Sequence, residues 1–322
     1  MTFSSPVVDC SLVDGHVDLP YALERMSLPA FAALQDGPVT TETLSGSRVE
    51  LITCALYCPD RFNGPESAWP QLNRLLNLAQ SGLGPLRPLP DVSCLTRPWA
   101  GGATSYQLLV ENGDGLLEAD LDSLQQQGVR MVGLTHAGCN RLADGNGVAK
   151  PGGLRPEGRS LLRELERRGW VVDLAHLAEP GFWEVLDGYA GPVMTSHTGL
   201  RSFCDRPRNL SREQLRALVE RGGVVGLALA PEMLTGDEAG IDDVVGQLEW
   251  MLEQIPAEMV AIGSDYCGFD GACRGLEDYR NWRTLGEMLS ERGFSEQVVR
   301  GILGGNWLNF YRRWLSDNAG AC

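Results

Sequence analysis

The sequence predicts an α/β protein folded as a single (β/α)8 barrel of the TIM type. Short runs rich in Val, Ile, Leu and Met recur eight times, and each is followed by Gly, Pro or polar residues and then by a longer amphipathic stretch. Near-continuous apolar strands that alternate with helices indicate a parallel sheet covered on both faces, and eight such strands close a barrel. An open doubly wound sheet is the second interpretation. No G-x-G-x-x-G follows the first expected strand and no G-x-x-x-x-G-K-[ST] occurs, so dinucleotide and P-loop phosphate sites lack their usual signature.

The expected strands and helices fit one domain over residues 1–322, because a barrel with insertions commonly exceeds about 250 residues. The strands lie within residues 7–16, 48–59, 106–113, 129–138, 170–177, 191–197, 223–231 and 259–266. The helices lie around residues 20–35, 65–83, 115–127, 156–169, 180–188, 211–221, 240–254, 276–293 and 295–316. The Pro- and Gly-rich stretch of about 60–105 reads as an inserted helix and loop over one barrel face, and about 295–316 as a C-terminal helix that begins after Ser295.

Composition narrows the class of partner. A net charge of -15 and a pI near 4.7 oppose binding to nucleic acid or to an anionic membrane, since both reward clustered Lys and Arg, so a small-molecule substrate is expected. The start of the chain has no basic and apolar leader, and no run of about 18 apolar residues occurs, so we expect a cytoplasmic protein without a membrane span. Nine Cys without a C-x-x-C pair fit reduced thiols better than disulfides or a thiolate zinc site.

Titratable residues gather at the ends of the expected strands. All four histidines of the chain stand at carboxyl ends, and three carboxylates stand at equivalent places: His16, His136, His176 and His197, with Asp18, Glu111 and Asp265. In a barrel these ends meet at one mouth, where catalytic groups of this fold lie. The sequence therefore predicts one site built from several strands.

The residue types at these ends indicate a metal centre. In extended backbone the pair His16 and Asp18 points to one side, so both side chains can hold one ion. Imidazole and carboxylate without thiolate suit zinc, with manganese, cobalt or iron as substitutes. The set exceeds what one tetrahedral ion needs, and it suits a two-metal site in which one carboxylate bridges and a shared hydroxide attacks.

Structural roles compete with this interpretation at single positions. A lone His at a strand end is as often a hydrogen-bonded structural residue as a ligand. Asp14, before Gly15, suits a turn or the orientation of a ligating His better than ligation itself, and Asp144 suits a turn. Whether Asp173 faces inward depends on a register that the pattern leaves open.

Seven separated segments also carry a family resemblance. They are "DGHVDLP", "VENGDGL", "GLTHAGCNRLADG", "VVDLAHL", "PVMTSHTGLRSFCDRPRNLSREQLRALVERGGVVGL", "AIGSDY" with "GLEDY", and "LGGNWLNFYRRW". Collinear from about residue 8 to 315, they resemble the renal-type (membrane) dipeptidase family of zinc metallopeptidases, which is similar to the amidohydrolases. The resemblance implies a (β/α)8 barrel with two zinc ions per chain that hydrolyses dipeptides, often as a homodimer.

The resemblance also implies metal-binding roles for matched residues. His16 and Asp18 look like ligands of one zinc, and Glu111 looks like the carboxylate that bridges both ions. His176 and His197 look like ligands of the second zinc.

Three further residues match positions that act on the substrate. Asp265 looks like the acid/base residue beside the first zinc and belongs to the metal site, and His136 looks like the residue that binds the scissile carbonyl oxygen. Arg208 looks like the partner of the substrate's terminal carboxylate, a role that suits its planar fork and would favour dipeptides. A structural ion pair with Asp205 is the competing role for Arg208.

Departures from the family pattern keep two alternatives open. Val17 replaces a common Asn, Ile52 replaces a usual Gln, and "SDYCGFDGACRG" is longer than usual, so Asp265 and Asp270 could exchange roles. The longer loop, at 266–274, would lie over the mouth. The same binuclear barrel could therefore act on a modified dipeptide or lactam, or serve as a non-catalytic binding protein.

Overall fold

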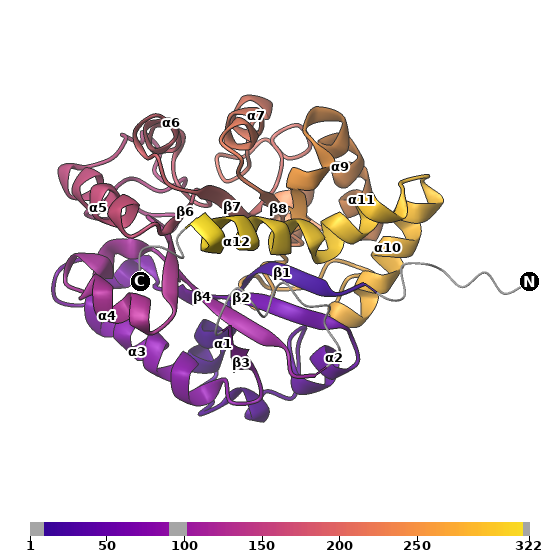
Figure 1. Ribbon diagram of the computed structural model, residues 1–322, viewed down its shortest axis with the longest axis horizontal. Coiled ribbons are helices and arrows are strands. Elements are labelled where there is room, and N and C mark those ends of the chain that lie inside the picture. The colour runs from indigo at the N-terminus through magenta and orange to yellow at the C-terminus, as the bar shows by residue number, and fades with distance from the viewer. Residues whose placement is uncertain (1–9, 90–101, 318–322) are drawn as a thin grey trace, which may run out of the picture.

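The structure, a computed structural model, describes residues 10–89 and 102–317 and shows eight parallel strands inside a ring of helices (Figure 1). The strands pair in the order β1-β2-β4-β5-β6-β7-β8-β9, and β3 pairs with β4 outside this path. Their bounds are β1 (Leu12–Val17), β2 (Val49–Tyr57), β3 (Arg87–Pro88), β4 (Ser105–Glu111), β5 (Val129–Gly133), β6 (Val171–Asp173), β7 (Val193–Thr198), β8 (Val225–Leu227) and β9 (Val260–Ile262). The predicted barrel is confirmed, and the open doubly wound sheet is wrong.

The barrel closes between β1 and the residues that follow β9. Val17 and Tyr266 form a parallel bridge, and the N–H of Asp18 donates to the carbonyl of Tyr266 at 2.9 Å. The N–H of Asp265 donates to the carbonyl of His16 at 3.1 Å. Three residues predicted for the site thus take part in the hydrogen bonds that close the ring, so closure itself sets their relative positions.

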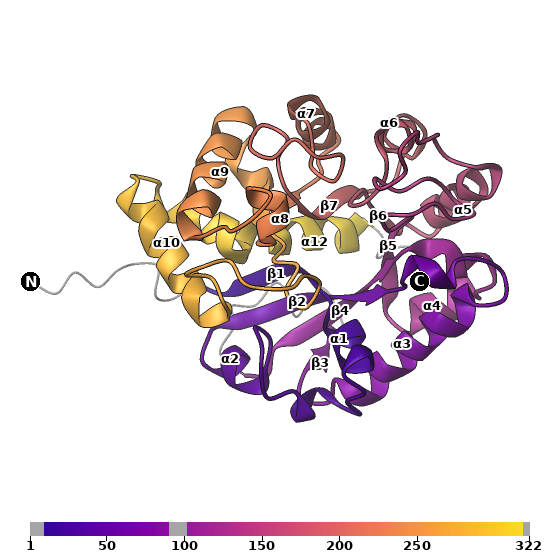
Figure 2. The same cartoon turned by 180° about the vertical axis from the view of Figure 1, so that it is seen from behind.

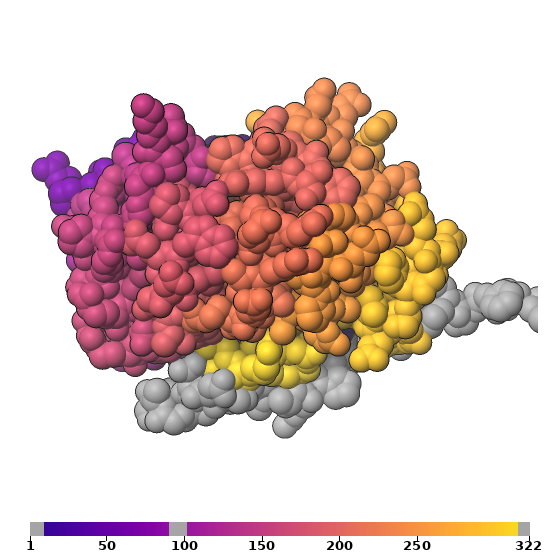
Figure 3. All heavy atoms as spheres, turned by 90° about the horizontal axis from the view of Figure 1, so that it is seen from above, coloured from indigo at the N-terminus to yellow at the C-terminus, as the bar shows by residue number. Residues whose placement is uncertain are grey.

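Helices surround the strands (Figure 1), and in Figure 3 the atoms of the middle of the chain form a continuous outer surface. The α-helices are α1 (Leu19–Arg25), α2 (Thr41–Ser45), α3 (Ala68–Gly82), α4 (Leu121–Gln126), α5 (Pro156–Arg167), α6 (Glu179–Gly188), α7 (Arg212–Glu220), α8 (Pro231–Leu234), α9 (Ile241–Gln254), α10 (Trp282–Glu291), α11 (Glu296–Arg300) and α12 (Asn306–Asp317). Short 3₁₀ turns are η2 (Phe31–Ala33), η3 (Asp60–Phe62), η5 (Gly113–Leu117), η6 (Ala257–Met259) and η7 (Tyr279–Asn281), and η8 (Gly301–Gly305) is a π turn.

Three of the expected helices are interrupted, and the one expected at 115–127 consists of the turn η5 and the helix α4. The helix expected at 20–35 ends with α1, because Ser27 adopts a φ of 55° and Pro29 cannot continue the hydrogen-bond ladder; only the turn η2 follows. The helix expected at 295–316 is divided into α11, η8 and α12. The division falls at Gly304, which approaches the β1 backbone so closely that a Cβ atom would lie 2.7 Å from a main-chain nitrogen.

The amino end of the barrel is closed by α12, which crosses the strands in Figure 1. Its aromatic side chains pack against an inward-facing layer that the strands contribute: Val13, Leu51, Leu109, Met131, Val171, Met194 and Ala261. Trp307 donates from Nε1 to the carbonyl of Ile262 at 2.7 Å and lies so close to Gly15 that a Cβ there would be 2.4 Å from its ring. With this end filled, a ligand can reach the strands only from the opposite end, which faces the viewer in Figure 2.

The expected insertion at about 60–105 contains α3 and the short strand β3, while its residues 90–101 lie outside the described residues. Residues 7–9 of the first expected strand lie outside them as well. Within the described parts of the chain, no helix combines the length and apolar character that a membrane span requires.

Candidate metal centre

The predicted site residues meet at the mouth opposite α12. His16 and His197 lie within the last residues of β1 and β7, and Glu111 ends β4. His176 lies three positions after the end of β6, and Asp265 lies three positions after the end of β9. The strand ends therefore bring together side chains that are up to about 250 positions apart in the sequence, as the barrel prediction requires.

The first half-site consists of His16, Asp18 and Asp265, whose ligand atoms lie within 4.8 Å of one another. All three residues are buried, and His16 Nε2 is 3.7 Å from an Asp18 oxygen. Burial and the neighbouring Asp18 raise the pKa of Asp265 well above its usual value, and burial followed by Glu111 raises the pKa of Asp18. Burial lowers the pKa of His16, but Glu111 and Asp18 outweigh it and raise the pKa well above the usual value. This half-site holds more negative charge than its buried surroundings tolerate without a cation.

The second half-site consists of His176 and His197. Their Nε2 atoms are 3.2 Å apart, and His176 Nε2 is 3.0 Å from Glu111 Oε1. The Nδ1 atoms face other acceptors, Asn146 Oδ1 at 3.3 Å for His176 and Ser196 Oγ at 2.9 Å for His197. If each Nδ1–H donates to its acceptor, each Nε2 has a lone pair, and the two lone pairs face each other. A cation between them would stabilise this arrangement.

Glu111 lies between the two half-sites. One of its carboxylate oxygens is 3.0 Å from His176 Nε2, and the other is 3.4 Å from His16 Nε2. Burial raises the pKa of Glu111, but His16 and His176 outweigh burial and hold the pKa well below its usual value. An ionised carboxylate with one oxygen on each side is suited to bridge two cations.

Unsatisfied buried atoms support the same interpretation. His16 Nε2, Asp18 Oδ1 and Glu111 Oε2 are buried and lack a hydrogen-bond partner. Buried polar atoms are almost always paired, so three unpaired ones on neighbouring site residues indicate a missing ligand atom or ion. The donor set is imidazole and carboxylate, and no cysteine belongs to any such cluster among the described residues. The residues present therefore fit divalent zinc.

Strained backbone accompanies the site. Among the described residues outside glycine, positive φ angles occur at only five positions, and three belong to the site or adjoin it: His176 at 64°, Asp265 at 64°, and Asn112, next to Glu111, at 69°. Such conformations are uncommon for side chains other than glycine, and they cluster where the surrounding structure must aim a functional group.

His136 lies beside the second half-site, with its ring centroid 4.4 Å from that of His176. Its Nδ1 is 3.2 Å from Asp60 Oδ2 and 3.5 Å from the Tyr57 hydroxyl. Asp60 also accepts from the N–H of Gly138 at 2.9 Å. Asp60 and Tyr57 are not among the residues predicted from the sequence, although both stand at the carboxyl end of the second expected strand, the same signal that identified the other site residues.

Arg208 is a half-buried cation at the mouth. Its Nη2 donates to the carbonyl of His197 at 3.1 Å, and burial lowers the pKa of its guanidinium. Among the described residues no carboxylate oxygen lies within 4.0 Å of Arg208, so the alternative of an ion pair with Asp205 is wrong. Guanidinium N–H groups of Arg208 are therefore available to bind a substrate carboxylate.

Asp270 lies outside the site. Its side chain is fully exposed and is 3.8 Å from Arg25, whereas Asp265 groups with His16 and Asp18. The exchange of roles between Asp265 and Asp270 that the longer loop allowed is therefore not what the structure shows.

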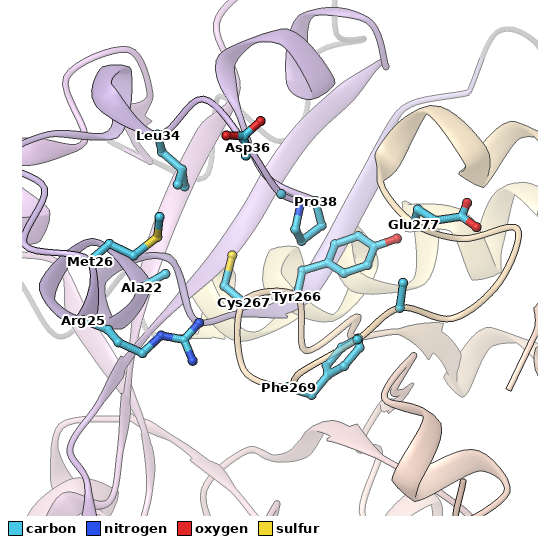
Figure 4. Close-up of a pocket in the computed structure, with 13 residues that line it drawn as sticks. Ala22, Arg25, Met26, Leu34, Asp36, Pro38, Tyr266, Cys267, Phe269 and Glu277 are labelled. Atoms are coloured by element: carbon cyan, nitrogen blue, oxygen red, sulfur yellow. The ribbon is translucent and has the colours of Figure 1, made fainter. Parts of the chain in front are cut away.

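The longer loop packs against the side of the mouth. Together with α1 and residues 34–38 it encloses a pocket of about 150 Å³ (Figure 4). Cys267 and Phe269 of the loop, Met26 after α1, and Leu34 contribute to its lining, so the pocket is mostly apolar. Because Cys267 follows Asp265 by two residues, this loop connects the pocket directly to the first half-site.

Two buried aspartates lie behind the site. Asp14 accepts from the hydroxyl of Ser264 at 2.5 Å and from Tyr279, and burial raises its pKa to about 6. Asp173 faces inward and accepts from the hydroxyl of Ser196 at 2.5 Å, and burial raises its pKa as well. Both therefore orient neighbours of the site residues. Asp144 instead binds the N–H of Gly152 and pairs with an arginine, as expected of a loop residue.

Comparisons with known proteins agree with this geometry. The family described as "Membrane dipeptidase (Peptidase family M19)" matches residues 4–315. Dipeptidase aclJ of Aspergillus oryzae is 33% identical over 186 residues, which cover 56% of this chain and 44% of that protein. Dipeptidase 3 of Rattus norvegicus is 28% identical over 333 residues, covering 95% of this chain and 65% of that protein. The chain thus spans less than two thirds of the length of these curated relatives.

Solved structures share the fold. A metallo peptidase from Rhodobacter sphaeroides, liganded with a phosphinate mimic of the dipeptide L-Ala-D-Ala, is 21% identical with a TM-score of 0.84 and covers 95% of this chain and 99% of its own. The probable dipeptidase PvdM from Pseudomonas aeruginosa is 18% identical with a TM-score of 0.82, and the match covers 97% of each chain. At these identities the likeness establishes the barrel fold alone.

Proposed function

The chain belongs to the membrane dipeptidase family, Peptidase family M19, and on that premise we propose that it is a zinc-dependent dipeptidase. The observation that carries the proposal is the division of the Glu111 carboxylate, with one oxygen 3.0 Å from His176 and the other 3.4 Å from His16. A carboxylate shared between two sets of ligands is what a pair of ions about 3.5–4 Å apart requires.

His16 and Asp18 would hold one zinc, His176 and His197 the other, and Glu111 both. Bound zinc would supply Lewis acidity, polarising the scissile carbonyl and lowering the pKa of the attacking water shared between the ions. Asp265 lies in the first half-site, where its carboxylate can take the proton of the attacking water and pass it to the leaving amine. The positive φ at Asp265 aims its side chain into this half-site.

Two residues would position the substrate. His136 stands beside His176 and can donate to the scissile carbonyl oxygen as negative charge develops there. Arg208 would bind the terminal carboxylate of the substrate, because among the described residues it has no carboxylate partner of its own. This arrangement restricts hydrolysis to substrates with a free carboxylate close to the scissile bond, that is, to dipeptides.

A modified dipeptide or a lactam is the second candidate substrate. The loop at 266–274 favours it, because this loop borders an apolar pocket of about 150 Å³ next to the residues that follow Asp265.

Metal content and turnover measured together test the proposal. Protein purified without chelator should contain about two zinc ions per chain and should release free amino acids from a panel of L,L and L,D dipeptides that includes L-Ala-D-Ala. A silent panel with two bound zinc ions would favour the modified substrate. A silent panel without bound metal after zinc supplementation would overturn the proposal and favour a non-catalytic binding barrel.

Two further expectations stay predictions. The homodimer is checked by light scattering of the purified protein at several concentrations. The cytoplasmic location is checked by fractionating the cells that produce it.

A further inference from the structure

Ser196 lies between one imidazole of each half-site. Its hydroxyl oxygen is 3.0 Å from Nδ1 of His16 and 2.9 Å from Nδ1 of His197. The same oxygen is 2.5 Å from Asp173 Oδ2. Ser196 and both histidines are almost fully buried, so water does not compete for these contacts.

When Asp173 is ionised, the donors and acceptors of this cluster can be assigned in only one way. Oδ1 of Asp173 accepts from the N–H groups of Ser196 at 2.9 Å and Ala175 at 3.1 Å, which leaves Oδ2 to accept the single hydroxyl proton of Ser196. The two lone pairs of the hydroxyl oxygen can then only accept, and their partners are the Nδ1–H groups of His16 and His197. When both imidazoles are neutral, both histidines therefore carry their proton on Nδ1 and a lone pair on Nε2.

Both Nε2 atoms face the metal centre. That of His16 is 3.4 Å from Glu111 Oε2, and that of His197 is 3.2 Å from His176 Nε2. We propose that Ser196 is a positioning residue shared by the two half-sites, fixing the tautomer and ring orientation of one zinc ligand in each. This inference rests on the proposed zinc centre. It assigns to one hydroxyl a function that metal sites usually distribute over separate carboxylates or carbonyls, one for each histidine.

The chain contains a matched control for Ser196. Ser264 also directly precedes a site residue, and its hydroxyl also donates to a buried carboxylate, that of Asp14, at 2.5 Å. Its other hydrogen-bond partners are main-chain atoms, the carbonyl of His16 and the N–H of Tyr266, and among the described residues it binds no imidazole nitrogen. Loss of this hydroxyl removes a comparable buried hydrogen bond without touching a histidine tautomer.

The test is ¹⁵N NMR of the histidine-labelled, metal-free full chain, with signals assigned through single His→Gln variants. In the unmodified protein, at an alkaline pH at which both imidazoles are neutral, His16 and His197 should both show the Nδ1–H tautomer. Ser196→Ala should give mixed tautomers at both positions, and Ser264→Ala should leave them unchanged. Asp173→Asn is an independent variant: its amide would donate to the Ser196 hydroxyl, whose proton must then go to one imidazole, so one of the two histidines should switch.

Zinc affinity measured by chelator competition is the second readout. Ser196→Ala should weaken the binding of both ions by roughly 10- to 100-fold, the usual cost of losing a partner that orients a metal ligand. Unchanged tautomers and affinity in Ser196→Ala, with two zinc ions bound by the unmodified protein, would overturn this inference and leave the proposed dipeptidase intact. An unmodified protein that binds no zinc would overturn both.

Discussion

The two halves of the metal centre differ in charge and in origin. The first half-site has two carboxylates and one imidazole and lies where the barrel closes between β1 and the residues after β9. The second has two imidazoles, one from the residues that follow β6 and one from β7, away from the closure of the ring. Burial raises the pKa of Asp265, while burial lowers the pKa of His176 and His197 well below the usual value.

The same physical effect thus has opposite consequences in the two halves. Burial disfavours the charged form of every group, so His176 and His197 stay neutral and ready to ligate, whereas ionised carboxylates in the first half-site are costly without a cation. A cation is therefore required electrostatically in the first half-site and is held mainly by lone pairs in the second. Glu111 is where the two halves are joined.

Removal of the shared charge should have the largest effect. Glu111→Gln keeps the shape of the side chain but takes the anionic bridge from both half-sites, so we expect weakened binding of both ions and no detectable dipeptide hydrolysis. Elemental analysis and an amino-acid release assay measure this, with thermal unfolding of the metal-free protein as the control for folding. Normal zinc content and turnover would show that the halves are not joined through Glu111.

Removal of one ligand from the second half-site should affect one zinc ion and spare the other. His176→Ala should lower the content from about two zinc ions per chain to about one and abolish turnover while the barrel still folds. Because His176 has a φ of 64°, His176→Asn is the matched variant, since Asn tolerates this conformation better than Ala. Wild-type activity in a variant shown to lack the second ion would contradict the two-ion proposal.

The acid/base role of the first half-site is tested by two aspartates in the same part of the chain. Asp265→Asn should lower kcat by about 10²- to 10⁴-fold, the usual contribution of a general acid or base. Asp270→Asn should change kcat by no more than about twofold, because its side chain is exposed and away from the site. Equal losses in the two variants would point to a shared effect on the loop.

The smallest effect among the site residues is expected at Arg208, which belongs to neither half. Arg208→Met should raise KM for dipeptides with a free carboxyl terminus by about 10- to 150-fold, corresponding to about 1.5–3 kcal/mol for a hydrogen bond to a charged group. For the same dipeptide with an amidated carboxyl terminus, KM should change little. If the free acid and the amide are affected equally, Arg208 acts through its hydrogen bond to His197 instead of through the substrate.

Strand-end residues could be predicted because a parallel barrel gives them a common position. The apolar pattern located the eight strands, and each predicted ligand stands on or just after the end of one of them. The helices were less accurate where a local conformation decided the outcome, as at Ser27 with its φ of 55°. Gly304 shows the same limit, since its close approach to β1 is a tertiary contact that helical periodicity does not report.

The sequence by itself determined the barrel and the residue types at its mouth, because strand periodicity and the scarcity of His are local properties that need no coordinates. Only the tertiary structure decided which oxygens and nitrogens face one another. It separated Asp265 from Asp270, directed Asp173 at Ser196, and placed that hydroxyl between His16 and His197. These outcomes depend on strand register and ring closure, which link residues up to about 250 positions apart and leave no periodic pattern in the chain.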